Sequence, residues 1–262
     1  MAGHNKWSKI KHRKAQVEKK KTKLWSKISR AIMVAARNGG GDPETNLSLR
    51  YAIDEARYAN MPRDTIERAV KKGTGDGDQS SFETVRYEGY SPGGIAVVVD
   101  ALTDNRTRTI VDVRNSFLDV GGNVGASGCV AYMFQPRGII IVSGKGLTED
   151  RLLEIVIDAG ALDVNSTLDP DADPHADPDD PEDDSGVRAF EVTTQVAAFG
   201  AVRDAAERAN LMIVAAELTM IPDTITAVAG EHAKSVLALV DALEDLDDVQ
   251  KVYTNADIHD EE

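Results

Sequence analysis

The chain has 262 residues, of which 42% are hydrophobic, and its 30 basic and 44 acidic residues give a formal net charge of −14. Its single cysteine, Cys129, excludes an intramolecular disulfide and a four-cysteine zinc site. If the acidity behind the sequence pI of about 4.8 were spread evenly, it would argue against a nucleic-acid-binding protein.

The charge is not spread evenly along the chain. Residues 1–72 contain 18 basic and 7 acidic residues, whereas residues 73–262 contain 12 basic and 37 acidic residues. Charges act locally, because physiological salt screens them over roughly 8 Å. We therefore expect a basic end that binds a polyanion, attached to an acidic body.

The basic end begins with 30 residues that hold 11 basic residues and one acid, Glu18. This density suits phosphate neutralisation, and an aromatic side chain within it could stack on bases. The alternative is that Trp25 belongs to the core and the lysines form a solvated helix face. The candidate nucleic-acid contacts are Lys6, Trp7, Lys9, Lys11, His12, Arg13, Lys14, Lys19, Lys20, Lys21, Lys23, Lys27 and Arg30.

Residues 1–72 carry the pattern of three helices. Apolar residues at helical spacing predict a helix over 14–37 that ends at Gly39-Gly40-Gly41. Asp42 and Pro43 indicate the start of a second helix, whose apolar stripe is Leu49, Ile53 and Ala56. Pro62 starts a third helix, for which Gly73 is the predicted stop.

After the glycine-rich link 73–78 the pattern changes to α/β. Strands are predicted at 82–87 and 95–102, a helix at 107–120 and a strand at 129–134. The turn between the first two strands is either an ordinary hairpin turn or a tip with an exposed aromatic residue that contacts RNA. The residues of this possible RNA-contacting loop are Tyr87, Tyr90, Ser91, Pro92, Gly93 and Gly94.

Residues 136–221 follow the ferredoxin-like element order. The predicted elements are strands at 138–142, 161–164, 187–193 and 213–220 and helices at 148–158 and 195–209. The loop 165–186 interrupts them. The stretch from Asp163 to Asp184 holds ten acids, four prolines and no lysine or arginine, so we expect disorder in this loop.

The C-terminal part supplies one helix, 232–246, and one strand, 249–254, which cannot form a domain alone. Residues 79–135 lack a second helix, so we expect 222–256 to return and complete them. The predicted fold class is α+β with three domains: a basic three-helix domain (1–78) and two α/β ferredoxin-like domains. One of these is discontinuous (79–135 plus 222–256), and the other (136–221) is inserted in it and carries the acidic loop.

Targeting and catalytic signals are missing from the sequence. The N-terminus lacks the apolar stretch of a signal peptide, and no apolar run approaches the ~20 residues that span a bilayer, so a cytoplasmic location is the default expectation. Gly144, Lys145 and Gly146 follow a predicted strand but do not complete a phosphate-binding P-loop. We expect no catalytic residues, no metal site and no cofactor.

Several long motifs resemble the YebC family. They are MAGHNKWSKIKHRKA, AARNGGGDPETN, NMPRDTIERAVKKGTG, RYEGYSPGGIAVVVDALTDNRTRT and GGNVGASGCVAYMF. The family includes bacterial proteins called probable transcriptional regulators and a mitochondrial translational activator of cytochrome c oxidase. The resemblance implies a helical N-terminal domain, two α/β domains of which one is discontinuous, and nucleic-acid binding without catalysis.

Two hypotheses about function follow. In the first, the protein is a ribosome-associated translation factor that contacts ribosomal RNA through its basic end. In the second, it is a transcriptional regulator that binds promoter DNA. The helix predicted after Pro62 is basic but short, and no recognition helix can be singled out.

Overall fold

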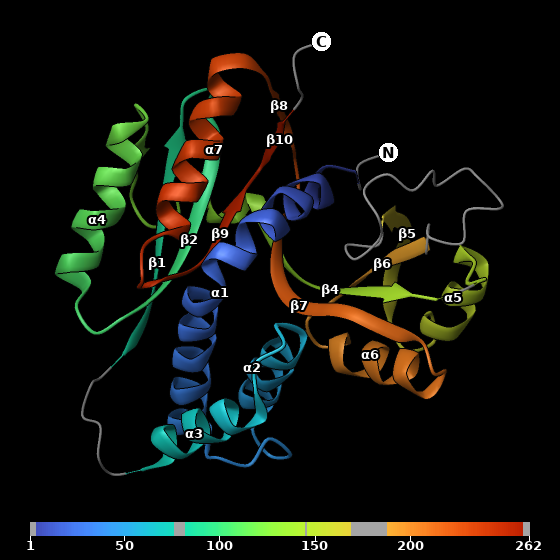
Figure 1. Cartoon of the computed structure of the whole chain (residues 1–262). Coiled ribbons are helices and arrows are strands. Elements are labelled where there is room, and N and C mark those ends of the chain that lie inside the picture. The colour runs from blue at the N-terminus through green and yellow to red at the C-terminus, as the bar shows by residue number, and fades with distance from the viewer. Residues whose placement is uncertain (1–3, 76–81, 145, 169–187, 259–262) are drawn as a thin grey trace. The chain divides into compact units, whose positions relative to one another are not determined.

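The computed structural model describes residues 4–75, 82–144, 146–168 and 188–258, with side chains described from Thr22 onward and not for Leu168 and Arg188. It contains two compact units (Figure 1). The first unit comprises Met1–Lys21, Arg57–Asn60 and Pro136–Thr219; the second comprises Thr22–Ala56, Met61–Gln135 and Met220–Glu262. The α+β fold class predicted from the sequence is confirmed.

The predicted three helices are present as α1 (His4–Gly39), α2 (Leu47–Tyr58) and α3 (Arg63–Thr74). The predicted stripe of α2 is buried at Leu49, Ile53 and Ala56. The predicted start of α2 at Asp42 was wrong. Asp42 closes a turn by accepting from the Glu44 amide at 2.9 Å, and Asn46 caps the helix by accepting from the Leu49 amide at 3.1 Å.

Gly73 does not stop α3, which continues to Thr74. It lies where α3 crosses α1 within the second unit. A Cβ atom at this position would come within 2.4 Å of the Met33 carbonyl oxygen, which belongs to the rigid backbone of α1. Glycine is therefore required at this crossing.

We expect Gly73→Ala to destabilise the protein by about 2 kcal/mol, because the overpacking penalty exceeds the gain in helix propensity. Thr74→Ala is the matched control, since Thr74 is exposed and its hydroxyl bonds only to its own helix. Thermal unfolding of both variants measures the difference between their melting temperatures. Equal melting temperatures would contradict the close crossing.

The sheet of the second unit has the strand order β3-β1-β2-β9. Its members are β1 (Glu83–Ser91), β2 (Ile95–Thr103), β3 (Asn123–Val124) and β9 (Val249–Thr254). The C-terminal strand β9 pairs antiparallel with β2, although about 150 residues separate them in the sequence. The continuous apolar run of β2 is buried on both faces of this sheet.

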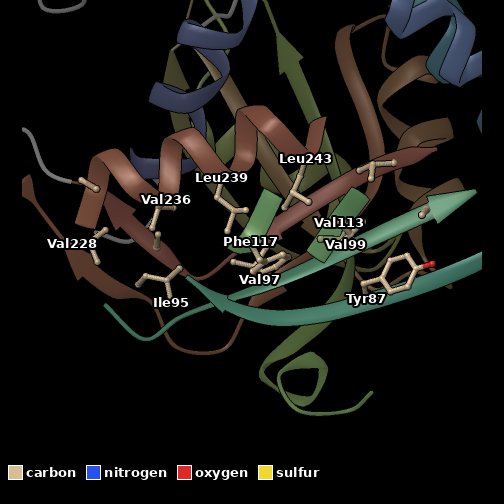
Figure 2. Packing of buried hydrophobic residues seen from close by; sticks show 14 of the residues in the cluster. Tyr87, Ile95, Val97, Val99, Val113, Phe117, Val228, Val236, Leu239 and Leu243 are labelled. Atoms are coloured by element: carbon tan, nitrogen blue, oxygen red, sulfur yellow. The ribbon is translucent and has the colours of Figure 1, made fainter. Parts of the chain in front are cut away.

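Helices α4 (Arg106–Asp119) and α7 (Gly230–Glu244) supply the core on one face of the sheet. Figure 2 shows Val113 and Phe117 of α4 and Leu239 and Leu243 of α7 in the same cluster as Val97 of β2. All five are buried. Two further short strands, β8 (Thr226–Val228) and β10 (Ala256–Ile258), pair in parallel beside this core.

The opposite face of β2 is covered by the segment 129–134. Val130 and Phe134 pack on Ala96 and Val98. The predicted strand at 129–134 was wrong: the segment holds the short 3-10 helix η1 (Ala131–Met133), and the strand β4 (Phe134–Ser143) begins after it.

The first unit contains the predicted ferredoxin-like elements. In chain order they are β4, α5 (Glu149–Val156), β5 (Ala161–Leu168), β6 (Arg188–Thr194), α6 (Phe199–Arg208) and β7 (Met212–Pro222). The strand order is β5-β6-β4-β7, and β6 is antiparallel to both β4 and β5. Residues 165–168 of the loop expected to be disordered belong to β5, which extends to Leu168, and residues 169–187 lie outside the described part.

The described helices include none that is both long and apolar enough to cross a membrane.

Candidate nucleic-acid interface

Helix α1 carries all thirteen predicted nucleic-acid contacts. The backbone of the first part of the helix is described, but the side chains up to Lys21 are not. This leaves ten of the predicted contacts outside the described side chains: Lys6, Trp7, Lys9, Lys11, His12, Arg13, Lys14, Lys19, Lys20 and Lys21. The remaining three, Lys23, Lys27 and Arg30, lie in the second unit and are described in full.

Lys23, Lys27 and Arg30, here called the basic clamp, contact residues 244–248, which comprise the last residue of α7 and the turn that follows it. Lys23 donates to the Asp245 carbonyl oxygen, and Lys27 donates to the Glu244 carbonyl oxygen at 2.7 Å. Arg30 donates to the Asp247 carbonyl oxygen at 2.8 Å. The last carbonyls of a helix have no partner within it, and cations stabilise that end. The clamp thus caps the C-terminus of α7.

Carboxylates reinforce these backbone contacts. The Lys23 ammonium lies 3.7 Å from the carboxylates of both Asp245 and Asp247, and the Arg30 guanidinium lies 3.3 Å from Asp248. Arg30 also stacks over the ring of Phe82, with 5.4 Å from its guanidinium carbon to the ring centroid. The structure therefore places the three predicted nucleic-acid contacts against acidic groups of the chain itself.

Burial disfavours the charged ammonium of Lys27. Burial, and next the neighbouring charge of Lys23, lower the pKa of Lys27 to about 8, although Asp247 and Asp245 raise it. The charged form of this side chain is therefore better solvated in water than in the clamp.

We expect the stability of the protein to gain from deprotonation of Lys27 between about pH 8 and the ordinary lysine value of 10.5. In this range the folded chain has lost the proton and the unfolded chain still binds it, so rising pH favours folding. The melting temperature of the natural chain should therefore rise relative to that of Lys27→Met as pH increases through this range. A difference that stays constant with pH would contradict the lowered pKa.

Asp248 is the centre of a buried polar network beside the clamp. It accepts from Arg108 at 2.7 Å, from the Thr109 hydroxyl at 2.8 Å and from the Thr103 hydroxyl at 3.1 Å. Burial favours the neutral acid, but these hydrogen bonds outweigh it and hold the pKa of Asp248 below its usual range. The network fastens the start of α4 and the end of β2 to the turn before β9.

An open pocket of about 510 Å³ lies beside these residues. Arg30, Arg108, Phe82 and the aspartates of the turn after α7 contribute to its lining. Its positive groups are already paired with carboxylates, so the pocket offers a mixed surface in place of a continuous basic one.

The structure corrects the predicted loop between β1 and β2. The register pairs Ser91 with Ile95, which leaves only Pro92, Gly93 and Gly94 in the turn. Tyr87 and Ser91 are buried in strand β1, and the hydroxyl of the half-buried Tyr90 donates to the Cys129 carbonyl oxygen at 3.1 Å. The expected exposed aromatic tip is therefore absent from this turn, and the glycines are its exposed part.

Glu88 is a structural residue that the sequence did not reveal. Its buried carboxylate accepts from the backbone amides of Gly128, Val130 and Ala131 at 2.7 to 2.8 Å. Burial raises the pKa of Glu88, but these amides outweigh it and lower the value overall. The loop before η1 is thus fixed around an internal carboxylate, and Tyr132 beside it is 72% exposed.

Among the described side chains, no three His, Cys, Asp or Glu residues are grouped so that they could hold a metal ion.

Comparison with known proteins matches two family models to nearly the whole chain. The model described as the TACO1/YebC protein N-terminal domain matches residues 5–76, and that of the TACO1/YebC second and third domain matches residues 82–256. A probable transcriptional regulatory protein of Desulforapulum autotrophicum is 46% identical over 100% of this chain and 98% of its own length. A protein of the same description from Idiomarina loihiensis is 48% identical over 100% and 97%.

A solved structure shows the same fold. The crystal structure of a conserved hypothetical protein from Aquifex aeolicus superposes with a TM-score of 0.77 at 42% identity and covers 94% of both chains.

Proposed function

The chain belongs to the TACO1/YebC family, and we propose that it is a non-enzymatic, cytoplasmic regulator of gene expression that binds nucleic acid. In this proposal it acts as a ribosome-associated translation factor and contacts ribosomal RNA through the basic segment Lys6–Lys21. It needs no cofactor and no small-molecule substrate.

The observation that carries the proposal is the concentration of positive charge at one end of a single long helix. Lys6 to Lys21 lie on α1, whose later part is buried at Ile28, Ile32 and Ala36 in the second unit. A basic helix can follow a phosphate backbone without reading base edges. This mode of binding suits ribosomal RNA, which proteins recognise largely by shape and by phosphate contacts.

The exposed turn Pro92–Gly94 is proposed as a secondary contact. Gly93 and Gly94 carry no side chains and adopt φ angles of 84° and 73°, so a phosphate backbone can approach the turn closely. The buried Tyr87 and Ser91 are not part of this contact.

The second candidate function is transcriptional regulation through promoter DNA. It is favoured by the relatives, which are described as probable transcriptional regulatory proteins. Helix α3 is basic, but Arg63 pairs with Glu67 at 2.7 Å, and Arg68 donates to the Asp64 carbonyl oxygen and the Thr65 hydroxyl. Two arginines of this helix are therefore directed to its own groups.

Sedimentation of cell lysate through a sucrose gradient separates the two functions. At low salt we expect the full chain to co-sediment with ribosomal particles and to leave them as salt increases. Its absence from every ribosomal fraction at low salt would overturn the translation-factor proposal. A sequence-specific footprint on DNA at physiological salt would establish the alternative.

A further inference from the structure

We propose that the basic clamp is an autoinhibitory latch, in which the acidic turn 244–248 occupies cations that a bound nucleic acid would otherwise neutralise. This inference rests on the proposed function and adds its regulation. The latch is closed in the structure: Lys23, Lys27 and Arg30 all contact the turn.

The turn presents the chemistry of a short polyanion. Residues 244–248 offer the carbonyl oxygens of Glu244, Asp245 and Asp247 and the carboxylates of Asp245, Asp247 and Asp248 to the clamp. Lysine and arginine bind phosphate oxygens by the same charge-assisted hydrogen bonds. A nucleic acid and the turn therefore compete for the same groups.

The outer contacts of the latch are weak enough to be exchanged. The side chains of Asp245 and Asp247 are 55% and 79% exposed. Exposed ion pairs contribute little free energy and are screened by salt. Lys23 should be the first residue to leave, because its carboxylate partners are the exposed ones.

Opening leaves the buried carboxylate of Asp248 with hydrogen-bond partners. When Arg30 moves away, Asp248 keeps its hydrogen bonds from Arg108, Thr109 and Thr103. The unfavourable burial of the Lys27 ammonium is relieved at the same time. Both features lower the cost of the open state.

The position of the clamp along α1 connects it with the proposed binding segment. Lys23 follows Lys21 by two residues in the sequence, and Arg30 follows it by nine. A nucleic acid that binds at 19–21 therefore reaches the latch by extending along the residues that come next in the chain. Conversely, the closed latch shortens the basic surface that is open to the ligand.

The test is the affinity of the full chain for a 30-nucleotide single-stranded RNA, measured by fluorescence anisotropy. Asp245→Asn/Asp247→Asn removes the outer acids of the latch. Asp119→Asn/Asp241→Asn is the control, because both aspartates are exposed on α4 and α7 and the net charge changes equally. We expect the latch variant to bind RNA about threefold to tenfold more tightly than the control. This factor is the change in affinity expected from the loss of two exposed ion pairs that compete with the RNA.

The outcomes distinguish the latch from the proposed function. Equal affinities of the two variants would overturn the latch and leave nucleic-acid binding intact. If neither the natural chain nor either variant binds RNA at low salt, the proposed function fails and the latch fails with it.

Discussion

Reversal of Lys19, Lys20 and Lys21 to glutamate is expected to lower the affinity for RNA by at least about 100-fold at 0.1 M salt. Each phosphate contact adds about 0.7 to the salt dependence on single strands, which is roughly a fivefold factor in affinity at this salt concentration. Loss of three contacts accounts for the stated factor, and repulsion by the new carboxylates adds to it. Anisotropy titrations at several salt concentrations should show the slope reduced by about 2.

Lys23 is left unchanged in this variant because it contacts the turn after α7. Its replacement would disturb the latch together with the binding segment. The matched control reverses Lys71, Arg114 and Arg151, which are exposed on α3, α4 and α5 and lower the net charge equally. An equal loss of affinity in both variants would show that total charge, and not the segment 19–21, governs binding.

Replacement of Asp248 by alanine is expected to destabilise the protein by about 3 kcal/mol. The substitution removes the carboxylate that accepts from Arg108, Thr109 and Thr103. The two hydroxyls and the guanidinium then lose this shared acceptor. Breaking a buried charged pair by deletion of one partner costs about 3 to 5 kcal/mol. Arg108 is 49% exposed and regains some water, so we expect the lower end of that range.

Thermal unfolding tests this expectation. A loss of 3 kcal/mol corresponds to a decrease in melting temperature of about 6 to 12 °C for a protein of this size. Asp247→Ala is the control at the neighbouring position, because its side chain is 79% exposed and its carbonyl contact with Arg30 survives. A decrease for Asp248→Ala no larger than that for Asp247→Ala would contradict the structural role of the network.

Elements with a strong local pattern were predictable from the sequence. The apolar run 95–102 predicted β2, and apolar spacing over 107–120 predicted α4 within one residue of its bounds. The count of elements led to the expectation that 222–256 returns to 79–135, and β9 indeed pairs with β2 in the structure. The exact limits of the proposed domains stay a prediction.

Elements decided by distant groups were not predictable. The apolar residues 129–134 resembled a strand, but Glu88 of β1 binds three backbone amides of this region, two of them within the segment, and holds it in a turn and 3-10 helix. Similarly, Asp42 and Pro43 carry a helix-start pattern, while Asn46 makes the cap because its amide group also reaches the carbonyls of Ala35 and Gly40 at 2.8 Å.

The contacts of the basic clamp could not be predicted from the sequence either. Lys27 and Glu244 are separated by 217 residues, so no local pattern connects them. Nothing in the spacing of the basic residues distinguishes Lys23, Lys27 and Arg30 from the lysines that precede them. Only the tertiary contacts identify Lys23, Lys27 and Arg30 as groups that bind the turn after α7.

The most direct test of the proposed function is the affinity of the full chain for purified ribosomal particles as a function of salt concentration. Contacts by the lysines and arginines of 6–21 predict tight binding at 50 mM salt and a logarithmic salt slope steeper than about −3, since each neutralised phosphate contributes about 0.7 to 0.9. Absence of binding at 50 mM salt, or a slope near zero, would contradict recognition of nucleic acid by the basic segment.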